Sequence, residues 1–173
     1  MKIGYVQTVI TPSLDKPVYL AGFGQNRRAE TVHDDLYARA LTIQTEEITL
    51  VLVALDLIGF FQQDMKDVVE ALKVSDVNLH VVIASTHTHH GPDTMGLWGP
   101  DDKTYMFAIK KKIVDTINAS LSDLKPASAK WTSVHVSGLA KNARNPEILD
   151  DELTLLQFAA DDGKPLVTLF DFP

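Results

Sequence analysis

Three of the six histidines in this chain lie close together, in the stretch IASTHTHHGPDTMG at residues 83–96. They follow the apolar run NLHVVIA, which is typical of a buried strand. Residues two apart on a strand point to the same face, so His87 and His89 would lie ~7 Å apart at their Cα atoms, with His90 pointing away. Such a pair suits a metal, but an open zinc site needs about three protein ligands and a water. A polar loop whose imidazoles cap a helix or face solvent is the alternative, and the H-x-H spacing alone leaves both open.

Other polar side chains stand where they could complete a site. His33, in VHDDLYARA, could supply a metal ligand or orient one through a hydrogen bond, or it could belong to a surface turn. Asp56 ends the apolar run LVLVALD and needs a partner if buried, either in the site or in a structural hydrogen bond. Arg144, in the loop KNARNPEILDDE, could clamp a carboxylate or a polar head group, or be an ordinary surface arginine. Because the chain has no cysteine, histidines and carboxylates must hold any metal.

The apolar pattern predicts the elements that carry these side chains. Alternating and β-branched runs predict strands, and apolar residues at spacings of three and four predict helices. Two pairs of strands should form hairpins, the second around the turn Asp161-Asp162-Gly163. Together they predict an α/β fold of one domain, with a mixed sheet flanked by helices. Strands are predicted at 2–11, 36–45, 48–58, 77–85, 127–138, 152–160 and 164–172, and helices at 61–72 and 101–124.

The amino-acid composition limits the classes of partner that this protein is expected to bind. The chain has 173 residues, of which 45% are hydrophobic, and 23 acidic side chains outnumber 16 basic ones, so a folded protein that does not bind nucleic acid is expected. The longest apolar run is shorter than the ~20 residues of a membrane span, which predicts no transmembrane segment. The N-terminus lacks a signal-peptide pattern, so we expect a cytoplasmic protein. The last predicted strand would leave an open edge, a template for another copy, and this favours a homo-oligomer.

Several motifs, in order along nearly the whole chain, resemble the N-terminal catalytic region of the neutral/alkaline ceramidase family. They are ITPSLDKPVYLAGFG, VHDDLYARAL, LVLVALDLIG, IASTHTHHGPDT, KNARNPEILDDELTLLQF and GKPLVTLFDFP. The most specific is THTHHGPD, close to the family's T-H-T-H-S-G-P with His90 in place of serine. The resemblance implies a zinc-activated water that attacks the amide of a small-molecule or lipid N-acyl substrate. It also implies that His87 is a zinc ligand, that His89 faces the substrate as an acid or hydrogen-bond donor, and that Arg144 contacts the head group.

The resemblance also implies that the metal site is incomplete. The family's second zinc histidine lies in an N-F-x-x-H-P motif just beyond a strand that resembles LVTLFDFP, and its glutamate and tyrosine ligands come much later. We therefore expect residues 1–173 to be the N-terminal part of a longer zinc-dependent amide hydrolase and to be inactive alone. The alternatives are an inactive ligand-binding or interaction module of the same fold, and a hydrolase of a different small amide or ester.

Overall fold

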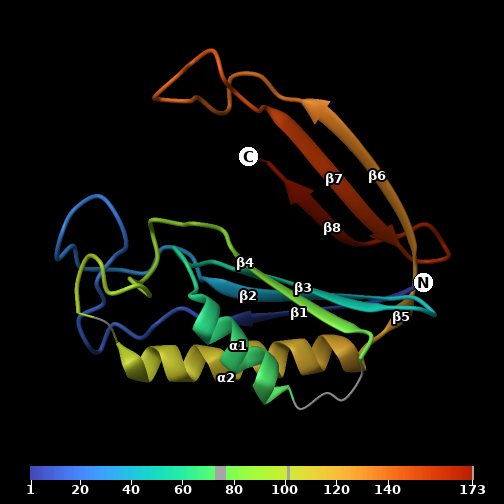
Figure 1. Ribbon diagram of the computed structural model, residues 1–173, viewed down its shortest axis with the longest axis horizontal. Coiled ribbons are helices and arrows are strands. Elements are labelled where there is room, and N and C mark those ends of the chain that lie inside the picture. Colours follow the sequence, from blue (N-terminus) through green and yellow to red (C-terminus); the bar gives the residue numbers. More distant parts are fainter. Residues whose placement is uncertain (73–76, 101, 173) are drawn as a thin grey trace. The chain divides into compact units, whose positions relative to one another are not determined.

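The computed structural model describes residues 1–72, 77–100 and 102–172. The chain forms two compact units, one spanning Lys2–Leu124 and the other Lys125–Pro173 together with Met1 (Figure 1). The larger unit holds the histidine cluster and both helices. Each unit has its own sheet.

The sheet of the larger unit is mixed. Within this unit the strand order is β4-β3-β2-β1. The pairs β1/β2 and β2/β3 are antiparallel and β3/β4 is parallel, which confirms the predicted mixed sheet and the first predicted hairpin. Both helices lie on the same face of this sheet in Figure 1. The elements of this unit are β1 (Lys2–Val9), β2 (Tyr37–Gln44), β3 (Thr49–Leu55), α1 (Gln62–Ala71), β4 (Leu79–Ser85) and α2 (Lys103–Ser122). The two-residue strand β5 (Lys125–Pro126) belongs to the smaller unit.

The core lies between this sheet and the helices. Burial alternates along β3, where every second residue from Thr49 to Leu55 is buried and the others are half-buried. The buried side chains pack against apolar residues of both helices, and fully burying one such side chain contributes about 1.5–3 kcal/mol. The helical members of this core include Val68, Ile109, Ile113 and Ile117.

Glycine at position 4 lets α2 approach the sheet closely. A Cβ atom at Gly4 would lie 1.9 Å from the backbone oxygen of Ser120, a distance that no side chain can adopt. The hydroxyls of Thr42 and Ser120 share a buried hydrogen bond of 2.7 Å beside this contact. These two buried hydroxyls are thereby paired, as buried polar groups require.

Both helices form close to where the sequence predicts them. Asp102 caps α2, since its carboxylate accepts from the backbone N–H groups of Thr104 and Tyr105. The predicted first residue, Asp101, lies outside the described residues. Neither described helix combines the length and apolar character that a membrane crossing needs.

The smaller unit is a three-stranded antiparallel sheet of order β6-β7-β8. Its strands are β6 (Ser128–His135), β7 (Glu152–Ala159) and β8 (Pro165–Asp171). The turn between β7 and β8 has Gly163 at a φ of 82°, and the Gly163 N–H donates to the Ala160 carbonyl at 2.8 Å. The hairpin predicted from Asp161-Asp162-Gly163 is therefore confirmed.

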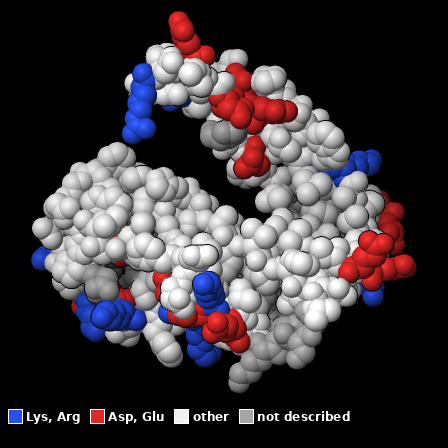
Figure 2. Space-filling view, viewed as in Figure 1, with Lys and Arg blue, Asp and Glu red and all other residues white. Residues whose placement is uncertain are grey.

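Charged side chains of both signs lie near one another on the face shown in Figure 2, without an extended basic surface there. Two ion pairs join the helices, because the Lys110 ammonium lies 3.1 Å from Asp64 Oδ1 and 2.8 Å from Asp67 Oδ2. The hydrogen bonds from Lys110 and Gln63 lower the pKa of Asp67, and the two carboxylates raise the pKa of Lys110. These pairs stabilise α1 against α2 at neutral pH.

Candidate functional site

His87 follows β4 in an unusual backbone conformation. The strand ends at Ser85, the Thr86 N–H still donates to the Leu55 carbonyl at 2.9 Å, and His87 then adopts a φ of 59°. This left-handed region costs a non-glycine residue roughly 1–2 kcal/mol. The turn brings Nδ1 of His87 to 2.8 Å from the carbonyl oxygen of Ile58, which lies beyond the end of β3 at Leu55.

The hydrogen bond to Ile58 selects the state of the imidazole ring. A carbonyl oxygen only accepts, so Nδ1 of His87 must carry the proton and donate. In the neutral ring the lone pair then lies on Nε2. Metal-binding histidines commonly use one nitrogen in this way and coordinate through the other. His87 could therefore coordinate a metal through Nε2, and its role as a zinc ligand stays a prediction.

The His89 ring lies beside the His87 ring, with centroids 5.1 Å apart and planes at 88°. The sequence analysis predicts that His87 and His89 lie close together, on the reasoning that both belong to a strand. That reasoning is wrong, because β4 has already ended at Ser85. The left-handed backbone at His87 brings the two rings together instead.

A loop from early in the chain covers one side of His89. Gly22 has a φ of 77°, and a Cβ atom there would lie 1.8 Å from Nδ1 of His89. The ring of Phe23 lies 4.8 Å from the His89 ring, and that of Trp98 lies 6.5 Å away. Among the described residues, Nδ1 of His89 is buried and has no hydrogen-bond partner.

Backbone hydrogen bonds hold this loop in place. The Ala21 N–H donates to the Gly91 carbonyl at 3.1 Å, and the Asn26 N–H donates to the Trp98 carbonyl at 2.7 Å. The early loop and the segment after the histidines thus form one structure around His89. Sequence reasoning treated the early segment only as a surface loop and missed Gly22, Phe23 and Trp98. The closely spaced GFGQN was the available signal, because Gly, Asn and Asp favour positive φ.

Asp93 organises the other side of this structure. Its carboxylate is 6% exposed and accepts from the backbone N–H groups of Met95, Trp98 and Gly99 at 3.0, 2.7 and 3.1 Å. Charge-assisted hydrogen bonds of this kind are stronger than neutral ones. Asp93 therefore fixes the position of the Trp98 backbone, and the sequence analysis did not single it out.

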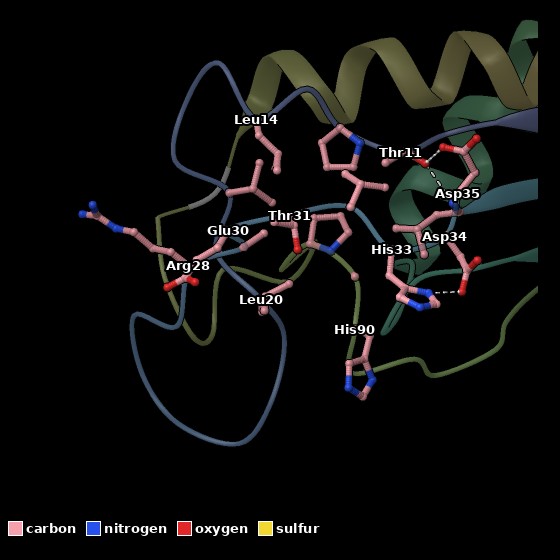
Figure 3. Close-up of a pocket in the computed structure, with 17 residues that line it drawn as sticks. Thr11, Leu14, Leu20, Arg28, Glu30, Thr31, His33, Asp34, Asp35 and His90 are labelled. Carbon is pink, nitrogen blue, oxygen red and sulfur yellow. Dashed lines mark hydrogen bonds and ion pairs between the residues drawn. The ribbon is translucent and has the colours of Figure 1, made fainter.

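His90 and His33 line a separate cavity of about 530 Å³ (Figure 3). Nδ1 of His33 lies 2.6 Å from Asp34 Oδ2, and both side chains are exposed. Asp35 instead accepts from the Thr11 hydroxyl at 2.8 Å. The predicted role of His33 beside a metal ligand stays a prediction. Most of the cavity wall is apolar, formed by Pro12, Leu14, Val18, Leu20, Leu36 and Pro92.

Asp56 directly follows β3 in the chain, and its carboxylate lies beside the first residue of β2. Its Oδ2 accepts from the Tyr37 N–H at 2.9 Å and from Arg39 Nη1 at 2.7 Å. These are the structural hydrogen bonds that the sequence analysis left as one option. Orientation of a metal ligand by Asp56 stays a prediction.

Arg144 belongs to the smaller unit and is exposed. Asn142 shapes its loop, because Asn142 Oδ1 accepts from the N–H groups of Arg144 and Asn145 at 3.0 and 3.1 Å. The Asn142 amide also donates to the Ile148 carbonyl at 2.9 Å. The loop is ordered by local hydrogen bonds, and the head-group role of Arg144 stays a prediction.

The donor set supports zinc only in part. His87 offers one suitably prepared nitrogen, yet within the described ranges no three histidine or carboxylate side chains gather closely enough to hold a metal ion. A catalytic zinc needs about three such ligands. His87 alone could hold zinc only together with further ligands, so zinc binding stays a prediction.

Comparison with family models and with curated proteins finds no match. Among solved structures, the neutral ceramidase from Pseudomonas aeruginosa matches with a TM-score of 0.87 and 24% identity, over 99% of this chain and 31% of that chain. A ceramidase complexed with C2 matches with a TM-score of 0.86 and 23% identity, again over 99% and 31%. The chain thus spans about a third of the length of these proteins. It has the fold of the corresponding part of neutral ceramidase.

Proposed function

We propose that these 173 residues are the N-terminal part of a zinc-dependent amide hydrolase of the neutral ceramidase type, acting on a small-molecule or lipid N-acyl substrate. The fold shared with ceramidases over 99% of the chain supports the proposal. The observation that carries it is the conformation of His87. Its backbone has a φ of 59°, and its Nδ1–H donates a hydrogen bond to the Ile58 carbonyl oxygen. Strain at a non-glycine residue persists where the surroundings impose it, and it is concentrated at functional sites.

In this proposal His87 supplies one zinc ligand through Nε2, and residues outside these 173 supply the others. Zinc, when bound, makes water a nucleophile at neutral pH and polarises the carbonyl under attack. His89 stands next to the ligand and is enclosed by Gly22, Phe23 and Trp98. Its Nδ1 is buried, which leaves Nε2 as the ring nitrogen to donate a hydrogen bond to the substrate's carbonyl oxygen or to pass a proton to the leaving nitrogen.

An inactive ligand-binding module is the second candidate. It is favoured by the lack of a three-ligand group among the described residues. The two candidates differ in whether a longer chain that contains these residues gains stoichiometric zinc and turns over an N-acyl substrate. A module would bind ligand with neither property.

The test uses the 173-residue protein and a longer chain that continues beyond it. Zinc content by mass spectrometry and release of a fluorogenic amine from an N-acyl amide are measured for each, in the wild type, in His87→Ala and in His80→Ala. The control residue His80 is an exposed histidine of β4. We expect weak zinc binding by the short chain, and zinc and turnover in the longer chain that His87→Ala abolishes and His80→Ala keeps.

Two results would contradict the proposal. Tight stoichiometric zinc on the 173-residue chain alone would show that its ligand set is complete. Full zinc content and activity in the longer His87→Ala chain would remove the role of that imidazole. Loss of activity in the His80→Ala chain as well would point to damage of the fold instead.

His87→Gly separates function from structure. Glycine accepts a φ of 59° without strain, which offsets the lost hydrogen bond to Ile58, each effect being on the order of 1 kcal/mol. We expect His87→Gly to unfold in urea close to the wild-type midpoint while zinc is lost. A large destabilisation would mean that the ring is retained for structure.

A further inference from the structure

The carbonyl group that orients His87 lies in a short connection between two elements. The Ile58 oxygen accepts from Nδ1 of His87 at 2.8 Å. Ile58 falls between the end of β3 at Leu55 and the start of α1 at Gln62, outside both hydrogen-bonded elements. The next residue is Gly59, and glycine has more backbone freedom than any other residue. The direction of the Ile58 carbonyl therefore depends on what holds the backbone of this connection.

The hydroxyl of Thr94 holds this backbone. Thr94 Oγ1 donates to the Gly59 carbonyl oxygen at 2.7 Å, one residue after the carbonyl that His87 uses. Thr94 and Ile58 are both buried, at 6% and 2% exposure. A buried hydrogen bond of this kind resists opening, because each partner would be left unpaired away from water. The Thr94 hydroxyl thus restrains the backbone on one side of the Ile58 carbonyl.

The segment that carries Thr94 is itself anchored. Asp93 Oδ1 accepts from the Met95 N–H at 3.0 Å, which closes a turn around Thr94, and the Asp93 N–H donates to the Tyr19 carbonyl at 2.7 Å. The Met95 side chain lies against Gly59, since a Cβ atom at Gly59 would be 2.9 Å from Met95 Sδ. Thr94 therefore acts from a fixed position, and its hydroxyl and the Met95 side chain meet the same short stretch of backbone.

We infer that Thr94 is a positioning residue for His87: its hydroxyl fixes the Gly59 backbone, so that the Ile58 carbonyl holds the imidazole with Nδ1 protonated and the lone pair on Nε2. This inference rests on the proposed function, in which Nε2 of His87 binds zinc, and it adds a residue that acts on this ligand through the backbone. Partners that orient a metal-binding histidine are typically worth about 10–100-fold in metal affinity. Thr94 acts one step further away, so its loss should cost about tenfold, the lower end of that range.

The experiment detects the protonated nitrogen of the imidazole directly. Long-range proton–nitrogen NMR correlations distinguish a protonated ring nitrogen from an unprotonated one, and they are recorded on the 173-residue protein at about pH 8.5, well above the ordinary pKa of histidine. The His87 signals are those absent from His87→Ala. Thr94→Val removes the hydroxyl at nearly constant volume, and Thr94→Ser keeps it. The matched control is Thr116→Val, because Thr116 is 1% exposed and its hydroxyl donates to the Lys112 carbonyl at 2.7 Å, within α2.

The proton of His87 should reside on Nδ1 in the wild type, in Thr94→Ser and in Thr116→Val. In Thr94→Val we expect a mixture of the two tautomers, because the Ile58 carbonyl no longer has a fixed direction. In the longer chain, the zinc dissociation constant is measured by competition with a chelator. It should rise about tenfold in Thr94→Val and stay unchanged in Thr94→Ser and Thr116→Val. Unchanged His87 signals in Thr94→Val would overturn the inference, as would an unchanged zinc dissociation constant.

A purely structural role of Thr94 gives a different result. The urea midpoints of Thr94→Val and Thr116→Val should fall by similar amounts, because each variant loses one buried hydroxyl. A role in stability alone would leave the His87 signals of the two variants alike, which would overturn the inference. Thr94→Ala also removes the hydroxyl, and it repeats the test if Thr94→Val does not fold.

The two proposals fail in different ways. If the proposed function is wrong, the longer wild-type chain binds no zinc, while a mixture of tautomers in Thr94→Val of the 173-residue protein still supports the role of Thr94. If the inference is wrong, the longer chain binds zinc with the same dissociation constant in the wild type and in Thr94→Val.

Discussion

The contact between Gly22 and His89 predicts the most specific mutational effect in this protein. A Cβ atom at position 22 would lie 1.8 Å from Nδ1 and 2.5 Å from Cε1 of His89, well inside any van der Waals contact. Gly22→Ala must therefore displace either the imidazole or the loop. Both belong to the candidate site, so the substitution tests whether these two segments hold each other in place.

Two terms set the size of the effect. Alanine at a φ of 77° costs roughly 1–2 kcal/mol because the left-handed region disfavours a Cβ atom. Overpacking against a side chain that can shift only in part adds about 1–3 kcal/mol. Gly22→Ala should thus destabilise the larger unit by roughly 2–5 kcal/mol.

Gly163 supplies the control for the backbone term. It has a φ of 82°, close to the 77° of Gly22, but a Cβ atom there would meet nothing within 4 Å. Urea unfolding of Gly22→Ala is followed at Trp98 in a Trp131→Phe protein. Unfolding of Gly163→Ala is followed at Trp131 in a Trp98→Phe protein. Gly163→Ala should cost the smaller unit the backbone term alone.

A double-mutant cycle with His89→Ala isolates the steric term. Without the imidazole there is room for the new Cβ atom, so Gly22→Ala should cost only about 1–2 kcal/mol in that background. The difference between the two backgrounds is the coupling energy of the pair. An equal cost of Gly22→Ala with and without His89 would refute the claimed contact between the loop and the ring.

Three further changes test other features. Asp93→Ala should destabilise the larger unit by roughly 2–4 kcal/mol in urea, because three backbone N–H groups lose their acceptor, and an unchanged midpoint would show that the loop needs no such anchor. Lys110 lowers the pKa of Asp67 from 3.8. The ion pair therefore stabilises the fold above pH 3.8, and this stabilisation is lost as the pH falls through the folded-state pKa of Asp67. Thermal unfolding of Lys110→Met should lack this acid-dependent loss. Asp151 raises the pKa of His135 from 6.5. The ion pair between them therefore stabilises the fold fully below pH 6.5, and this stabilisation is lost as the pH rises through the folded-state pKa of His135. Thermal scans of His135→Gln should lack that loss, and a wild-type curve with no pH dependence in this range would contradict the ion pair.

The fold could be predicted where burial repeats with a regular period. The nearly continuous apolar run TLVLVAL predicts β3, and in the structure every second residue of it is buried while the others are half-buried. The stripe of Ile109, Ile113 and Ile117 identifies α2 because these residues are buried at helical spacing. Turn chemistry fixed the β7/β8 hairpin, since Gly163 takes up its positive φ. In each case neighbours in sequence determine the local structure.

The site was predictable only in part, because contacts between distant segments build it. H-x-H singled out His87 and His89, but the residues that enclose His89 include Gly22 and Phe23, more than sixty positions earlier. No local periodicity reports such a contact. The ring orientation of His87 depends likewise on the Ile58 carbonyl, which any residue could have supplied at that position. Backbone partners leave no mark in the sequence.

The distribution of backbone strain gives an independent indication of where the site lies. Within the part of the chain that the structure describes, the non-glycine residues with positive φ are Phe23, Asn26 and His87. Each belongs to one of the two segments that meet around His89. Left-handed backbone costs about 1–2 kcal/mol at residues such as Phe23 and His87, whereas asparagine tolerates it better. The strained residues gather around one imidazole with a buried and unpaired Nδ1, which supports the proposed site, and histidine spacing by itself would not have revealed this arrangement.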